Sequence, residues 1–208
     1  NSGGATFAGA VTTGTSVVIT DTTDAATVAF NGALTTPTLT TASQAYNLAL
    51  NATGTAITNA VTFLNTGTLA LGASSSSTQT YTGGFTATAP SASTLKGTIN
   101  STNAAMVFGP VTLGANTTLN SNATTTAGDI TLGAVTLGSN TLTLQTGNAI
   151  SGADVSGTSV SGLGSLALQN IGGTVSFSGA VSPASLTVPN TVVNVALTGS
   201  TGTITNAV

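Results

Sequence analysis

The stretch Val111-Thr-Leu-Gly-Ala-Asn116 returns, at an offset of 24, as Val135-Thr-Leu-Gly-Ser-Asn140. The stretch Thr141-Leu-Thr-Leu-Gln145 returns at the same offset as Ser165-Leu-Ala-Leu-Gln169. Within these stretches apolar residues alternate with small polar ones, so an extended strand would have one apolar side. A short period of two or three such strands with tight turns is typical of one coil of a β-solenoid.

The same period appears near the start of the chain, where Phe7-Ala-Gly-Ala-Val11 returns at an offset of 23 as Phe30-Asn-Gly-Ala-Leu34. No window shows the apolar stripe of a capped helix. We therefore predict an all-β protein, with residues 1–208 forming a single continuous parallel β-solenoid. Its coils should contain about 20–24 residues, and about nine of them would form a rod of roughly 40 Å.

A longer repeat encloses the short one. Residues 27–61 align with residues 174–208 at an offset of 147, with 15 of 35 positions identical. Six or seven coils would separate the two copies. We interpret the chain as a segment of a longer tandem-repeat polypeptide. Two ranges rich in small residues, 73–80 and 87–94, are expected to form irregular loops.

Residues that suit tight corners separate the strands. Gly and Asn tolerate a positive φ, and proline cannot donate a hydrogen bond to a neighbouring strand. We expect corners or coil edges at Pro37, Pro90, Pro110, Pro183 and Pro189. Asn116 and Asn140 are one coil apart, so they form either a side-chain ladder or two independent turns.

Two other folds compete with the solenoid. Low charge and few aromatic residues can indicate disorder, but 40% of the residues are hydrophobic and many are β-branched. A string of β-sandwiches would show evenly spaced strands within about 100 residues, which the period of 23–24 disfavours.

Charged residues make up only 2% of the chain, and the net charge is −3. One lysine cannot neutralise the phosphates of a nucleic acid or bind an anionic membrane surface, so we expect neither partner. No stretch approaches the 18 or so consecutive apolar residues of a transmembrane helix. The charged residues are Asp21, Asp24, Lys96, Asp129 and Asp154.

Catalytic groups are scarce, because the chain lacks His, Cys and Glu. It therefore has no ordinary triad base and no thiolate nucleophile, and we predict no enzyme, no cofactor and no metal site. Asp129 and Asp154 are close to one coil apart and could stack as a weak Ca²⁺ site, but two turn aspartates are the preferred interpretation. Asp21 and Asp24 are interpreted as loop residues, and Lys96 as a solvated loop charge.

Two glycine-rich runs carry a resemblance to a known family. The runs Gly128-Asp-Ile-Thr-Leu-Gly-Ala-Val-Thr-Leu-Gly138 and Gly147-Asn-Ala-Ile-Ser-Gly-Ala-Asp154 resemble the repeat region of filamentous-haemagglutinin-type adhesins and large autotransporter-like exoproteins. The resemblance implies a right-handed parallel β-helix, secretion to the bacterial surface, and a role in adhesion or in an extracellular fibre. It carries over no functional residue.

The expected function is a non-catalytic, extracellular scaffold that associates with itself or with neighbouring repeats. The alternative is an adhesin stalk or a glycan-binding module that uses Thr, Asn and Tyr46 or Tyr81. An ice-binding solenoid is a minor alternative, suggested by three Thr-x-Thr steps: Thr38/Thr40, Thr141/Thr143 and Thr201/Thr203/Thr205. Glycosylation sequons occur at Asn51, Asn100, Asn116 and Asn122.

Overall fold

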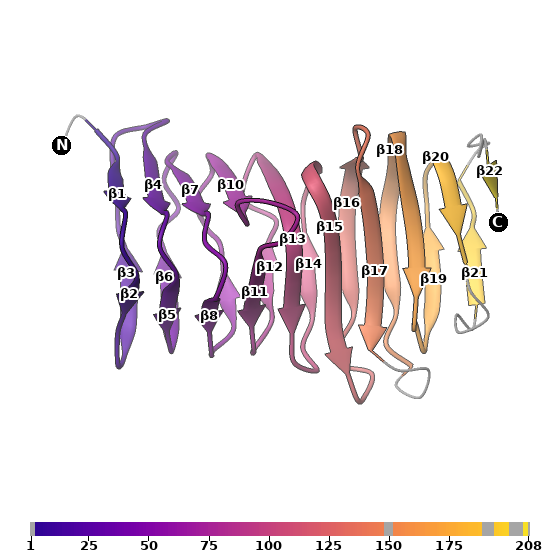
Figure 1. Cartoon of the computed structure of the whole chain (residues 1–208), viewed down its shortest axis with the longest axis horizontal. Coiled ribbons are helices and arrows are strands. Elements are labelled where there is room, and N and C mark those ends of the chain that lie inside the picture. The colour runs from indigo at the N-terminus through magenta and orange to yellow at the C-terminus, as the bar shows by residue number, and fades with distance from the viewer. Residues whose placement is uncertain (1–2, 148–151, 189–193, 200–205, 208) are drawn as a thin grey trace.

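The chain is a stack of parallel strands with the two termini at opposite ends of the stack (Figure 1). The computed structural model describes residues 3–147, 152–188, 194–199 and 206–207. In these ranges there is no helix, and the strands form a β-solenoid of about eight turns. The all-β, parallel-solenoid prediction is confirmed.

The strands lie in three faces, and the chain visits the first, second and third face in turn. The first face contains β1 (Ala5–Phe7), β4 (Thr27–Phe30), β7 (Asn47–Leu50), β10 (Thr68–Leu71), the starts of β13 (Ala92–Ser101), β15 (Val111–Ala123) and β20 (Val181–Thr187), the end of β16 (Ile130–Thr136) and the middle of β18 (Val155–Gln169).

The second face contains β2 (Val11–Thr12), β5 (Leu34–Thr36), β8 (Thr55–Ile57), β11 (Thr78–Tyr81), β17 (Thr141–Gly147), β22 (Asn206–Ala207) and the ends of β13, β15, β18 and β20. The third face contains β3 (Ser16–Ile19), β6 (Thr38–Thr41), β9 (Val61–Thr62), β12 (Phe85–Ala87), β14 (Met106–Phe108), β19 (Thr174–Phe177), β21 (Asn194–Leu197) and the starts of β16 and β18.

The short period in the sequence is the register of the coils. Phe7 pairs with Phe30, Val111 with Val135, and Leu142 with Leu166, as their spacings of 23 and 24 predict. Partner spacings extend beyond the predicted 20–24, from an offset of 18 between Ser93 and Val111 to an offset of 25 between Ile130 and Val155. The corners absorb this difference, because only the strands need to stay in register.

The core consists of columns of stacked side chains. On the first face Val28, Leu48 and Leu69 lie over one another and are at most 6% exposed. Phe30 lies on Phe7 with ring centroids 4.6 Å apart and nearly parallel planes. Each coil therefore removes the apolar surface of the coil below from water, at about 25 cal/mol per Å².

Four of the five prolines are in the described ranges. Pro37, Pro90 and Pro110 lie at corners, and Pro183 lies where β20 turns from the first face to the second. Pro189 lies outside the described residues.

The two expected loops are only partly irregular. In the range 73–80, residues 73–77 form a corner, and β11 begins at Thr78. In the range 87–94, Ala87 ends β12, residues 88–91 form the corner, and β13 begins at Ala92. Thr and Ser also occur at outward positions of strands, so a run of small residues does not by itself identify a loop.

A polar network interrupts the aliphatic core on the second face, and the sequence did not reveal it. The Gln79 Nε2 group donates to the Leu50 and Ala52 carbonyls at 2.6 and 3.0 Å. The Tyr81 hydroxyl donates to Gln79 Oε1 at 3.1 Å. Both side chains are at most 1% exposed, and burial raises the pKa of Tyr81 far above its usual range. The hydroxyl therefore remains a donor at any physiological pH.

Tyr81→Phe should lower the free energy of unfolding by about 1–3 kcal/mol, because it leaves the buried Gln79 Oε1 without its donor. Urea denaturation followed by circular dichroism measures this change. Thr80→Ala, an outward neighbour on the same strand, is the control and should change stability by less than about 0.5 kcal/mol. Equal effects of the two substitutions would contradict the role of the hydroxyl.

Candidate functional surface

The charged residues are spread along the rod. The only pair in adjacent coils is Asp129 and Asp154, and the described residues contain no group of three or more His, Cys, Asp or Glu side chains that could hold a metal. Asp129 Oδ1 accepts the Asp154 N–H at 2.8 Å, and Asp154 Oδ1 accepts the Thr174 N–H at 2.6 Å. Both carboxylates thus act as turn residues that bond to the next coil.

Asparagine side chains make the same hydrogen bond to a backbone N–H of the next coil. Asn47 is the first residue of β7, and Asn116 directly precedes the part of β15 that pairs with β17. Asn47 Oδ1 accepts the Thr68 N–H at 2.8 Å, and Asn116 Oδ1 accepts the Thr141 N–H at 2.9 Å. In each case the acceptor belongs to one coil and the donor to the coil that follows. The side-chain oxygen supplies a corner acceptor where the backbone bends away from regular strand pairing.

Asn116 and Asn140 do not use their amides on each other. Asn140 Nδ2 donates to the Leu113 carbonyl at 3.1 Å, while Asn116 bonds to Thr141 as above. Bonds between stacked amides occur at other positions: Gln145 Nε2 donates to Gln169 Oε1, and Asn51 Nδ2 donates to Asn31 Oδ1, both at 2.9 Å. Of the two interpretations of Asn116 and Asn140, the structure supports turn residues.

Asp154→Asn should leave the free energy of unfolding within about 0.5 kcal/mol of the parent, because an amide oxygen accepts the same Thr174 N–H. Asp154→Ala should cost about 0.5–1.5 kcal/mol, because this acceptor is lost. Thermal melting of the three proteins, each with calcium chloride and with a chelator, measures both effects. A melting temperature that rises with calcium in the parent and not in Asp154→Asn would show a Ca²⁺ site instead.

The two tyrosines expected on a glycan-binding wall lie in the interior. Tyr46 and Tyr81 are both 0% exposed, so neither ring can stack on a sugar, and that part of the expectation is wrong. The Tyr46 hydroxyl accepts the Ala42 N–H at 3.2 Å, and burial raises the pKa of Tyr46. A tyrosine in an alternating strand pattern is more often core than contact surface, because its ring fills space between coils.

The predicted Thr-x-Thr steps do not share a face. Thr38 and Thr40 lie on the third face, Thr141 and Thr143 lie on the second, and Thr201, Thr203 and Thr205 fall outside the described residues. Two polar columns run along the second face, and of their steps the sequence repeat revealed only that from Gln145 to Gln169. They are the threonine column Thr78, Thr98, Thr118 and Thr143, and the amide column Asn100, Asn120, Gln145 and Gln169.

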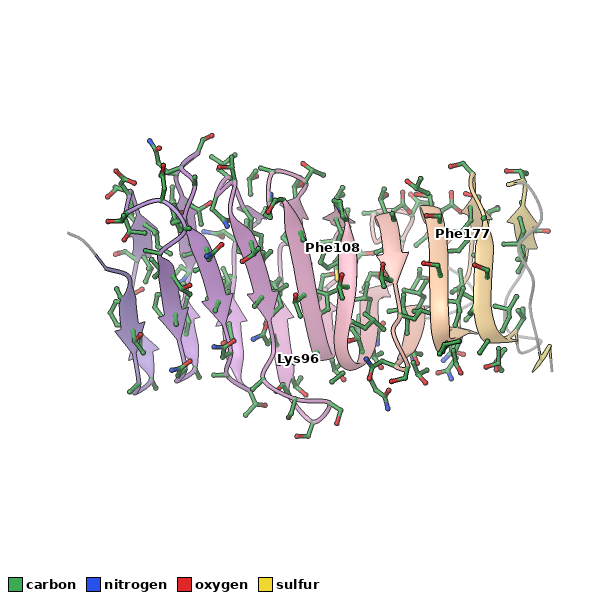
Figure 2. All side chains as sticks on the ribbon, turned by 90° about the horizontal axis from the view of Figure 1, so that it is seen from above. Lys96, Phe108 and Phe177 are labelled. Atoms are coloured by element: carbon green, nitrogen blue, oxygen red, sulfur yellow. The ribbon has the colours of Figure 1, made fainter. Side chains whose placement is uncertain are left out.

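Lys96 lies on strand β13, near the middle of the rod (Figure 2), and not in a loop as expected. Its side chain is half-buried and passes over Gly114 of the next coil. The methylene groups of the lysine cover this glycine, and the ammonium group at the end of the side chain stays near water.

Open grooves occur on the third face and at the N-terminal end of the described rod. The larger has a volume of about 410 Å³ and lies on the third face, lined by Thr131, Ser156, Ser176, Thr198 and their neighbours. The smaller, about 210 Å³, lies at the N-terminal end of the rod, where Phe7 is 41% and Val18 58% exposed.

Two of the four sequon asparagines donate a hydrogen bond from the amide nitrogen to the adjacent coil. Asn51 Nδ2 donates to Asn31 Oδ1, and Asn122 Nδ2 donates to the Ser101 carbonyl at 2.9 Å.

The described ranges include no apolar helix of membrane-spanning length. Comparison with protein-family models, curated proteins and solved structures gives no match.

Proposed function

We propose that this chain is a non-catalytic structural scaffold, a β-solenoid segment of an extracellular or surface-exposed fibre that associates with further copies of itself. The observation that carries the proposal is an uncharged column of small outward side chains that runs along the whole first face. Its members are Ala29, Ala49, Ala70, Thr94, Thr112, Thr136, Ser161 and Ser182. A second rod packed side by side on this face would remove no charged group of the column from water.

The neutral surface supports the same proposal. A neutral face packs on a second copy without the cost of removing a charge from water. Four of the five charged residues lie in corners and not in strands: Asp21, Asp24, Asp129 and Asp154.

Sedimentation velocity and negative-stain electron microscopy of the purified chain test the proposal. We expect elongated assemblies that grow with protein concentration, and we expect Thr112→Asp to shift them toward monomers because it places a charge in the outward column of the first face. Thr35→Asp, an exposed outward position on the second face, is the matched control and should leave the assembly unchanged. Monomers at all concentrations would overturn the fibre and favour a stalk.

The alternative, an adhesin stalk or glycan-binding module, is favoured by the polar columns of the second face. Its threonine and amide columns present hydroxyl and amide groups at about 4.8 Å intervals, the spacing of stacked strands. Co-sedimentation with insoluble neutral polysaccharides tests this function. Binding that is lost in Thr98→Lys and retained in Thr40→Lys, an exposed outward position on the third face, would support it. Thermal hysteresis of the same proteins would test ice binding.

A further inference from the structure

The two copies of the long repeat occupy different columns of the core. Seven coils after Val28, the same column of the first face is occupied by Val181. Val181 is not the copy of Val28 in the long repeat, because that copy is Val175. Val175 belongs to the third face. The column of Val28 is Val28, Leu48, Leu69, Ser93, Val111, Val135, Val160 and Val181, and the column of Val175 is Val61, Phe85, Met106, Ile130, Val155 and Val175.

We infer that the long repeat, with its offset of 147, spans six and two-thirds coils, so that its second copy is turned by one face about the rod axis. The strands β19, β20 and β21 of the second copy show the same displacement. Leu34 lies on the second face and its copy Val181 on the first, while Thr40 lies on the third face and its copy Thr187 on the second. One face is the step from Val175 to Val181.

The three faces accept the same strand because each imposes the same alternation of inward apolar and outward polar side chains. What differs is the neighbour below. Phe30 stacks on the Phe7 ring, whereas its copy Phe177 lies against Gly157, where an added Cβ would clash with the ring. The missing side chain of Gly157 provides the space that Phe177 needs on its new face.

The displacement decides where the repeat presents its outward residues. Identical side chains of successive copies point to different sides of the rod, and three copies are needed before the pattern returns to its first face. In a fibre built as proposed above, contacts between rods of the same chain would therefore form around the axis and not along one side. Only this last consequence rests on the proposed function.

Distances between spin labels test the inference on the monomeric chain, which has no native cysteine to interfere. Ala29 and Ser182 are outward residues of one column, seven coils apart, so labels at Ala29→Cys and Ser182→Cys should be separated by about 34 Å. Labels at Ala29→Cys and Ser176→Cys should lie further apart, although Ser176 comes earlier in the chain, because the two labels leave different faces.

The pair Ala29→Cys and Ser161→Cys, six coils apart on the same face, calibrates the rise and should give about 29 Å. If the distance from position 29 to 176 is equal to or shorter than that from 29 to 182, the copies share a face and the inference is overturned. The measurement does not depend on self-association, so it fails or succeeds separately from the fibre proposal.

Discussion

Leu144→Asp is expected to prevent the middle of the rod from folding. Leu144 is 0% exposed and lies between Leu119 and Leu168 in the coils below and above. A carboxylate at this position either ionises in an apolar column or takes up a proton to avoid doing so, and both cost several kcal/mol. We expect a loss of more than about 4 kcal/mol in the free energy of unfolding, against about 2–5 kcal/mol for Leu144→Ala.

Thr143→Asp provides the matched control, because Thr143 is the next residue on the same strand and points outward between Thr118 and Ala167. It should retain the parent's β-sheet circular dichroism and change stability by about 0.5 kcal/mol or less. Limited proteolysis followed by mass spectrometry would locate the damage in Leu144→Asp to the coils around it. If the two aspartates proved equally harmless, the register of this strand would be wrong.

Gly97→Val is expected to cost about 2–5 kcal/mol, the second-largest effect, through backbone strain and overpacking. Gly97 has a φ of +77° at the irregularity where β13 passes from the first to the second face. A Cβ there would clash with the Ser77 carbonyl oxygen and lie 2.7 Å from that of Ser74. The backbone strain amounts to about 1–2 kcal/mol, and displacement of the 73–77 corner adds about 1–3 kcal/mol.

Gly14→Val is the control for the added side chain, since a Cβ at Gly14 meets nothing within 4 Å. Its effect on the urea midpoint should be small. Gly97→Ala should fall between the two, because it keeps the φ strain and adds less bulk. A Gly97→Val protein with the parent's midpoint would show that the 73–77 corner is free to move away from β13.

The alternation in the sequence predicted which residues face the core, and the structure confirms it where the strands are regular. The pairs of Phe7 with Phe30 and Leu142 with Leu166 followed from spacing alone. The placement of Asp129 beneath Asp154 followed from the same reasoning, as a distance of one coil. Each of these pairings follows from the alternation of inward and outward residues within a strand and from the length of one coil.

The position of each strand around the rod was decided only by the tertiary structure. The threonine column joins Thr98, Thr118 and Thr143 across unequal offsets, which no fixed period connects. The burial of Tyr46, which lies in a corner just before β7, and the turned second copy of the repeat have the same origin. Inward and outward positions alternate along the chain, so the sequence determines them. The corners follow no such alternation. Their lengths decide on which face each strand lies and which residue of the next coil each side chain contacts.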